Sequence, residues 1–117
     1  MSIVIRRGDI FTVKLDPITG ADKVKARPAL IIQNDLGNRF SPSTLVAPIT
    51  SGQDPGYDFT VAVKAPEGGL IADSIILLNK IRTIDRSRLG KRLGRVDLET
   101  MEKVDRALRI SLGLIPL

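Results

Sequence analysis

The residue types best suited to chemistry stand in two short pairs, Arg27-Pro28 and Thr50-Ser51. The first pair precedes an apolar run at residues 29–32, and the second follows another run at residues 45–49. If the two runs form neighbouring strands, a guanidinium and a hydroxyl meet at one end of a sheet. A guanidinium presents a planar fork of donors to a phosphate, and a hydroxyl donates without adding charge. The structural alternative is that Arg27 forms a salt bridge and Thr50 caps a strand end.

Several catalytic chemistries are excluded because the 117 residues include no histidine and no cysteine. Ser-His-Asp, Cys-His and paired-imidazole mechanisms cannot be built, and zinc loses two of its usual ligand types. The acids are scattered, so we expect no metal ion and no other cofactor. The chain has no apolar run long enough for a membrane span and no signal peptide at its start. Since cysteine is also absent, we expect a cytoplasmic protein with no membrane contact.

RNA is the substrate best suited to phosphodiester cleavage without a metal ion or an imidazole. The ribose 2′-hydroxyl is an internal nucleophile beside the phosphorus, so proximity supplies much of the reduction in the barrier. A rigid arginine and a hydroxyl can then stabilise the negative charge that develops. Because a guanidinium stays charged near neutral pH, we expect Arg27 to stabilise charge first, with proton transfer by Arg27 as a second possibility. DNA lacks the 2′-hydroxyl and would not be cut by this route.

Positive charge is concentrated between residues 80 and 95. Seven basic residues stand there against one acidic residue, a net charge of +6 in a chain whose total is +5. Such a band favours a polyanionic partner such as nucleic acid. The alternative is a solvated surface to which acids come from elsewhere in the fold. The basic residues are Lys80, Arg82, Arg86, Arg88, Lys91, Arg92 and Arg95.

Hydrophobic periodicity predicts a single, mainly β domain over residues 1–117. Alternating or continuous apolar runs predict strands at residues 9–15, 28–33, 44–49, 59–64 and 73–78, and a short one at 81–84. The run at 28–33 is almost wholly apolar, which indicates burial on both faces. Residues 34–38 predict a turn. Because Pro48 cannot donate to a ladder, the third strand should lie at an edge or stop pairing there, which would leave Thr50 free.

The C-terminal region predicts an amphipathic helix. Asp97 can serve as its N-cap, Gly113 can end it in the left-handed conformation, and Pro116 prevents its continuation. Its apolar residues follow three- and four-residue spacing: Leu98, Met101, Val104, Leu108 and Leu112. Short strands with one such helix predict an α+β fold in which the helix packs on a small curled sheet or barrel.

Motifs along nearly the whole chain also carry a family resemblance. They read RGDIF at residues 7–11, RPALIIQND at 27–35, GNRFSP at 37–42, PITS at 48–51, GL at 69–70, DS at 73–74 and IRTID at 81–85. In these motifs and their spacing the chain resembles the MazF/PemK toxins of type II toxin–antitoxin systems. The resemblance implies a small SH3-like β-barrel of five to seven strands with a C-terminal amphipathic helix, assembled as a homodimer.

The resemblance also implies an activity and its residues. It implies a sequence-specific, metal-independent endoribonuclease, an mRNA interferase, that leaves a 2′,3′-cyclic phosphate and a 5′-hydroxyl on single-stranded RNA. The family's catalytic arginine and threonine fall on Arg27 and Thr50. A cognate antitoxin with an acidic or apolar tail is expected to block the RNA groove. The residues expected to bind RNA are Ile18, Asp22, Lys23, Lys25, Ser51, Lys80 and Arg82.

The sequence departs from this family in two segments. Residues 20–25 read Gly-Ala-Asp-Lys-Val-Lys where relatives often read Gly-Ser-Glu-Gln-Gly-Gly, and Asn79-Lys80 replaces a common Glu-Gln pair. In relatives these segments lie close to RNA bases. The departures therefore predict a different cleavage sequence with the same chemistry.

Two other classes of protein compete with a ribonuclease. A CcdB-like toxin of the same barrel type poisons DNA gyrase through a C-terminal tryptophan, but this chain ends Gly-Leu-Ile-Pro-Leu and contains no tryptophan. A non-catalytic RNA-binding barrel would stack bases on aromatic side chains. Only 3% of the residues are aromatic, and Phe11 and Phe59 are predicted core residues, so few stacking platforms remain.

Overall fold

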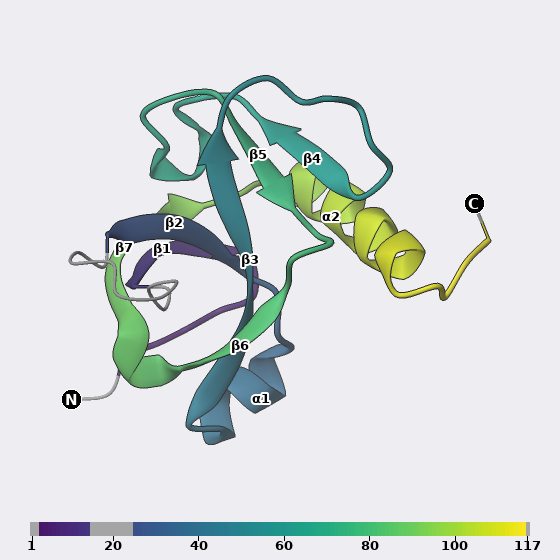
Figure 1. Cartoon of the computed structure of the whole chain (residues 1–117). Helices are drawn as coiled ribbons and strands as arrows, with labels where there is room; N and C mark the ends of the chain where they lie inside the picture. Colours follow the sequence, from purple (N-terminus) through teal and green to yellow (C-terminus); the bar gives the residue numbers. More distant parts are fainter. Residues whose placement is uncertain (1–2, 15–24, 117) are drawn as a thin grey trace, which may run out of the picture.

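The computed structural model describes residues 3–14 and 25–116, which form seven strands and two α-helices (Figure 1). The strands are β1 (Asp9–Lys14), β2 (Ala26–Ile31), β3 (Ser43–Ser51), β4 (Thr60–Val63), β5 (Ser74–Leu77), β6 (Arg82–Asp85) and β7 (Leu89–Arg95). The helices are α1 (Asp35–Phe40) and α2 (Leu98–Ser111), and two 3-10 turns are η1 (Glu67–Gly69) and η2 (Arg86–Arg88). The prediction of a mainly β protein with a C-terminal helix is confirmed.

The strands pair antiparallel in the order β4-β5-β3-β2-β1-β7, and β6 also pairs with β3. Strand β3 changes partners along its length, because β6 lies against residues 43–46 and β5 against residues 49–51. Turn η2 joins β6 directly to β7, so the five strands β6-β3-β2-β1-β7 curl into a barrel (Figure 1). The barrel is not closed, since β6 and β7 do not pair within the described residues. The curled, barrel-like sheet agrees with the sequence prediction.

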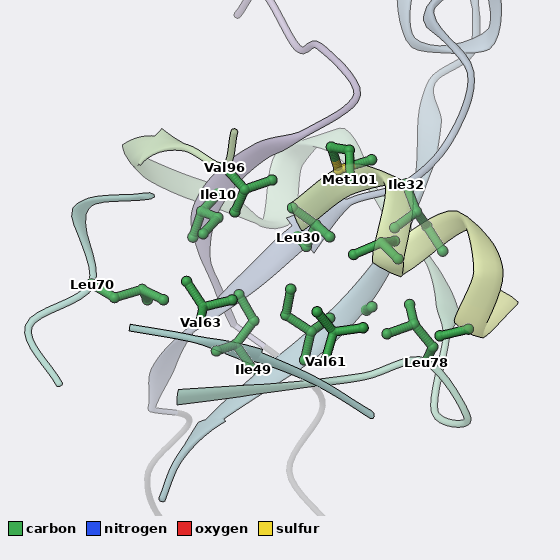
Figure 2. Packing of buried hydrophobic residues seen from close by; sticks show 14 residues of the cluster. Ile10, Leu30, Ile32, Ile49, Val61, Val63, Leu70, Leu78, Val96 and Met101 are labelled. Atoms are coloured by element: carbon green, nitrogen blue, oxygen red, sulfur yellow. The ribbon is translucent and has the colours of Figure 1, made fainter. Parts of the chain in front are cut away.

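Side-chain alternation gives the curled sheet two apolar faces, and each face has its own core. Inside the barrel lie Ile5, Phe11, Val13, Ala29, Ile31, Val46, Ile84 and Leu89. The opposite face carries Ile10, Leu30, Ala47, Ile49 and Ile76, which cluster with Met101, Val104 and Ala107 of α2 (Figure 2). Full burial of a Leu or Ile side chain contributes about 1.5–3 kcal/mol. The prediction that the second strand is buried on both faces is confirmed, because residues 29–31 are fully buried.

Helix α2 begins and ends as predicted, but fewer of its predicted apolar residues are buried than expected. Asp97 accepts a hydrogen bond from the Thr100 N–H at 2.8 Å, and Gly113 follows the helix with a φ of +72°. Met101 and Val104 are buried, whereas Leu98 and Leu112 are 77% and 56% exposed. Those two leucines stand at the ends of the helix, outside its packed middle. The predicted stripe was therefore wrong at both ends.

Two elements were not predicted from sequence. Residues 34–38 were expected to form a turn but open helix α1, where Asn34 accepts from the Gly37 N–H at 2.7 Å. Asparagine favours both structures, because its side chain accepts from nearby backbone N–H groups. The residues of β7 read LGKRLGR, with neither alternation nor an apolar run. This strand forms because β1 pairs with it, with register shifts on either side of Phe11.

The prediction of an edge position for the third strand was wrong. Strand β3 lies between β2 and β5, and Thr50 is paired with Ile75 of β5 rather than left without a partner strand. Pairing with β2 does stop at Pro48, which was the second predicted alternative. No helix within the described residues combines the length and apolarity that crossing a bilayer requires.

Candidate active site

Strands β2 and β3 carry Arg27 and Thr50 to the same end of the sheet. Their paired residues are Ala29–Pro48, Leu30–Ala47 and Ile31–Val46. Continuing this register by two residues sets Arg27 opposite Thr50, and residues opposite each other in an antiparallel pair share one face. That face is the one whose buried residues line the barrel interior. Both side chains are exposed, so they stand where the apolar interior ends and solvent begins.

Pro48 is accommodated without loss of a ladder hydrogen bond to β2. The Ile32 N–H donates to the Leu45 carbonyl at 3.0 Å, which makes that pair a hydrogen-bonded one. Because hydrogen-bonded and non-hydrogen-bonded pairs alternate, Pro48 falls on a non-hydrogen-bonded pair and its nitrogen faces away from β2. It faces the point at which β3 exchanges β6 for β5. The proline therefore allows the change of partner that positions Thr50.

Arg82 joins the same face. It is the first residue of β6 and lies opposite Val46 of β3. Alternation along β3 puts the side chains of Val46 and Thr50 on one side of the strand, so Arg82 lies on the face of Arg27 and Thr50. Arg82 is half-buried. Arg27 and Thr50 can together bind a phosphate and neutralise charge on it, and Arg82 adds a guanidinium on the same face, opposite the residue four before Thr50.

The other residues predicted to bind RNA are less closely grouped. Ser51 follows Thr50 directly, so its side chain lies on the opposite face, in register with the buried Ser74. Lys80 is exposed in the turn between β5 and β6, where its N–H donates to the Leu77 carbonyl at 3.3 Å. Lys25 is exposed immediately before β2. The predicted contacts Ile18, Asp22 and Lys23 lie outside the described residues.

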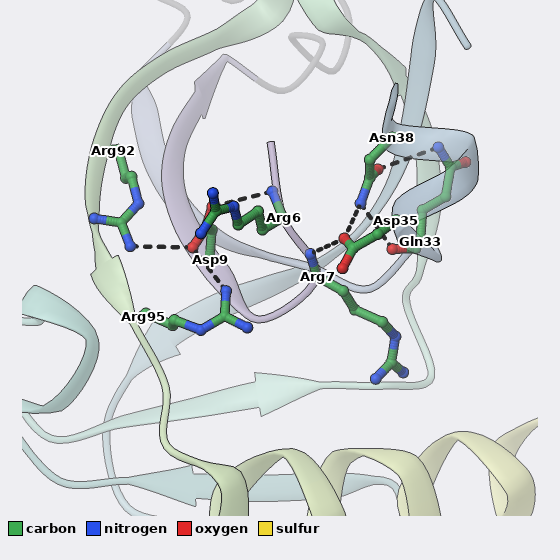
Figure 3. A network of polar contacts seen from close by, with 8 residues as sticks. All are labelled: Arg6, Arg7, Asp9, Gln33, Asp35, Asn38, Arg92 and Arg95. Atoms are coloured by element: carbon green, nitrogen blue, oxygen red, sulfur yellow. Dashed lines mark hydrogen bonds and ion pairs between the residues drawn. The ribbon is translucent and has the colours of Figure 1, made fainter. Parts of the chain in front are cut away.

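The Arg-Gly-Asp motif ends on the first residue of β1, Asp9, which anchors β7. The Asp9 side chain is only 3% exposed, and its Oδ1 accepts from Arg92 and Arg95, each at 3.1 Å (Figure 3). Its Oδ2 accepts from the Arg6 N–H at 3.1 Å. The sequence analysis did not single out this cluster; the signal that could have found it is the alternation that puts Asp9 on the same face as Phe11. In the described ranges, no three acidic side chains gather in an arrangement that could hold a metal ion.

A second polar network holds α1 against the barrel (Figure 3). Asp35 accepts from the Arg7 N–H at 2.7 Å, and this hydrogen bond lowers the pKa of the Asp35 carboxyl. Asn38 is buried, donates to the Gln33 carbonyl at 2.8 Å and accepts from the Thr44 hydroxyl at 2.7 Å. The Gln-Asn-Asp and Gly-Asn motifs therefore position elements and do not contribute to the exposed end of β2 and β3.

The basic residues of the band at 80–95 do not all lie on one surface of the fold. Arg92 and Arg95 pair with Asp9, which comes from β1. Arg86 donates to the carbonyls of Asn38 and Ile3. These three arginines fit the alternative of acids and acceptors arriving from elsewhere. Arg82 pairs with β3 opposite Val46. Arg88 and Lys91 lie against β1, and Arg88 donates to the Lys14 carbonyl at the strand end that also carries Arg27.

The fold and the site together define a small curled β-barrel with a cationic, hydroxyl-bearing edge suited to phosphate. The chain belongs to the PemK-like, MazF-like toxins of type II toxin–antitoxin systems, whose family model matches residues 6–112.

Two curated relatives match over almost their full length. The chain is 46% identical to "Endoribonuclease EndoA" of Bacillus subtilis (strain 168), over 97% of this chain and 98% of that protein. It is 44% identical to "Endoribonuclease MazF" of Staphylococcus epidermidis, over 95% of this chain and 93% of that protein.

Solved structures share the fold. A MazE–MazF complex from Deinococcus radiodurans superposes with a TM-score of 0.80 at 25% identity and covers 97% of this chain and 100% of that one. A mycobacterial endoribonuclease in complex with its cognate antitoxin gives 0.79 at 26% identity, covering 97% and 99%.

Proposed function

We propose that this protein is a toxin of a type II toxin–antitoxin system that acts as a sequence-specific, metal-independent endoribonuclease on single-stranded RNA, principally mRNA. The observation that carries the proposal is the antiparallel pairing of β2 and β3, because Arg27 and Thr50 are exposed at the ends of these paired strands and share one face when the register is continued. Two relatives named as endoribonucleases, at 46% and 44% identity, support it.

The proposed reaction is an internal transesterification. The ribose 2′-oxygen attacks the adjacent phosphorus and loses its proton, while the bond from phosphorus to the 5′-oxygen breaks and that oxygen takes up a proton. The products are a 2′,3′-cyclic phosphate and a 5′-hydroxyl, so no external nucleophile is consumed. Proximity of the 2′-oxygen lowers the barrier, and the protein lowers it further by stabilising the charge on the phosphoryl oxygens.

Arg27 and Thr50 are the proposed catalytic residues. The Arg27 guanidinium binds the two non-bridging oxygens as a planar fork and neutralises their growing charge. The Thr50 hydroxyl donates a further hydrogen bond to the same phosphate. Arg82 binds the RNA strand from the neighbouring strand β6, and Lys25 and Lys80 contribute positive charge on either side.

The proposed partners are the RNA substrate, a cognate antitoxin and a second copy of this chain. Among the solved neighbours are toxins bound to an antitoxin, which supports an antitoxin partner here. An acidic antitoxin segment would compete with RNA for the same arginines. The proposed compartment is the cytoplasm, where such a toxin meets mRNA.

The direct test is cleavage of a mixed single-stranded RNA pool in the presence of EDTA. Cutting should persist, and sequencing of the 5′-hydroxyl ends should reveal one short motif. Replacing the 2′-hydroxyl by hydrogen at the cleaved position should abolish cutting. Loss of activity on chelation would reject the metal-free mechanism, and cleavage of the deoxy analogue would reject internal attack.

Arg27→Ala and Thr50→Ala test the assigned residues. Each should lower kcat by about 10²–10³, the usual effect of removing one donor to a developing oxyanion. Melting temperatures should stay nearly unchanged, because both side chains are exposed. Ser51→Ala is a matched control, since Ser51 lies next to Thr50 but on the opposite face; an Arg27→Ala protein with full activity would reject the site.

A further inference from the structure

A depression of about 260 Å³ lies at the end of β1, β2 and β7, outside the group formed by Arg27, Thr50 and Arg82. Its floor is kept open by a glycine: a Cβ at Gly90 would stand 2.5 Å from the Thr12 Oγ1. The lining residues are Thr12, Lys14, Ala26, Ser87, Arg88, Leu89 and Gly90. Cations and hydroxyls therefore surround a space large enough for a phosphate group.

The charged residues in its lining distinguish this depression from the other depressions of the described chain. Three other depressions in the described part of the chain each include at least one aspartate, namely Asp35, Asp58, or Asp54 with Asp58. The lining here includes none. Asp85 stands two residues before Ser87 in the chain, and its carboxylate accepts from the Ser87 N–H at 3.0 Å. Among the described residues, an anion in the depression would therefore meet the positive charge of Lys14 and Arg88 with no acidic side chain in the lining.

The polar groups of the depression are held in place by the strands. The Arg88 Nη1 donates to the Lys14 carbonyl at 3.1 Å, which keeps this guanidinium at the end of β1. The Thr12 hydroxyl accepts from the Lys91 N–H at 2.9 Å, so its own proton can be donated to a ligand. The side chain of Lys14 is exposed and makes no ion pair with any described residue. Lysine in this situation is a mobile point charge suited to a phosphate.

The depression adjoins Arg27 directly. Lys14 and Ala26 form the last pair of β1 and β2, and Val13 and Arg27 form the pair beside it. Ala26 and Arg27 are consecutive, so their side chains lie on opposite faces of the same strand end. An RNA strand that crosses this end of the sheet with one phosphate on Arg27 passes the depression with a neighbouring part of its backbone. Lys25, exposed beside Ala26, adds charge on the same path.

We propose that this depression is a subsite for an RNA backbone phosphate flanking the scissile one, with Lys14, Arg88 and the Thr12 hydroxyl as its binding groups. The inference rests on the proposed ribonuclease function and adds a binding site to it. The subsite recognises the backbone and not the base, so it contributes affinity for every sequence. Neither Lys14 nor Arg88 touches the reacting atoms.

The test compares Lys14→Gln with Lys103→Gln, an exposed lysine on α2 that removes the same charge away from the strand end. Steady-state cleavage of a long single-stranded RNA is measured between low and moderate salt. Lys14→Gln should raise KM at low salt, leave kcat unchanged, and reduce the slope of log KM against log salt by about 0.7, the value for one phosphate contact on a single strand. Lys14→Glu should raise KM further, and Lys103→Gln should match the wild type.

Each other outcome overturns the subsite. If Lys14→Gln has the same KM and salt slope as the wild type or as Lys103→Gln, Lys14 contacts no phosphate. A fall in kcat at constant KM means that Lys14 acts on the reaction and not on a flanking phosphate. Weaker binding of the antitoxin with unchanged KM for RNA assigns the depression to a protein partner.

The subsite and the proposed function fail in distinguishable ways. If Lys14→Gln behaves like the wild type while Arg27→Ala is inactive, the function stands and the subsite is rejected. If the wild-type protein does not cut RNA, the function is rejected, and equilibrium binding of the same RNA to the same lysine variants decides the subsite. In that binding assay, a salt dependence of RNA affinity for Lys14→Gln equal to that of the wild type also rejects the subsite.

Discussion

The buried carboxylate of Asp9 provides a quantitative test of how β7 is held. One oxygen accepts from Arg92 and Arg95 and the other from the Arg6 N–H, all at 3.1 Å. In Asp9→Asn the amide must face either the guanidinium groups or that N–H, so a donor opposes a donor in both orientations. An unsatisfied buried donor costs about 1–3 kcal/mol. The lost charge adds about 1 kcal/mol, because both arginines are half exposed and screened.

The expected loss in the free energy of unfolding is therefore about 2–4 kcal/mol, measured by urea denaturation. Asp105→Asn is the matched control: Asp105 pairs with Arg7 at 2.6 Å, but its side chain is 37% exposed against 3% for Asp9. A pair of that exposure should contribute less than about 1 kcal/mol. Equal losses in the two variants, or a loss below about 1 kcal/mol for Asp9→Asn, would refute the argument from burial.

Two further predictions concern stability. Gly94→Ala puts a Cβ 2.6 Å from the Gly68 backbone and should strongly lower the free energy of unfolding. Gly113→Ala meets no atom within 4 Å, so it should cost only about 1–2 kcal/mol for its φ of +72°. Similar urea midpoints for the two variants would contradict this. Backbone N–H groups lower the pKa of Asp35 and Asp97 below the usual 3.8. The unfolded chain therefore protonates first, and this stabilisation, present above about pH 3.8, is lost as pH falls further. Melting scans against pH should show a smaller acid loss in Asp35→Asn.

Much of the fold was predictable because it is encoded by neighbouring residues. The apolar run in β2 indicated burial on both faces, and residues 29–31 are fully buried. The N-cap at Asp97 and the left-handed Gly113 were readable because capping depends on a few adjacent residues. Strand β7 was not readable, since two glycines and three basic residues give no period and its pairing comes from β1.

The candidate site was predictable in residue type and only partly in geometry. The sequence indicated Arg27 and Thr50 as a phosphate-binding pair, but it grouped Ser51 with Thr50, whereas the register puts them on opposite faces. It also treated residues 80–95 as one basic band. Asp9 and the carbonyls of Asn38 and Ile3 engage three of those arginines. Those partners are far away in sequence, so the charge pattern could not reveal them.

The sequence by itself determined the available chemistry, because a chain without histidine or cysteine is limited to guanidinium, hydroxyl, amine, carboxamide and carboxylate groups for polar contacts. It also determined where six of the seven strands of the described residues and the C-terminal helix form, since alternation and capping are local properties. Only the tertiary structure decided which of these groups meet. Arg27 faces the same side as Thr50 and Arg82 because β3 pairs with β2, β5 and β6 in one register. Register depends on backbone partners from distant segments, and no local pattern specifies it.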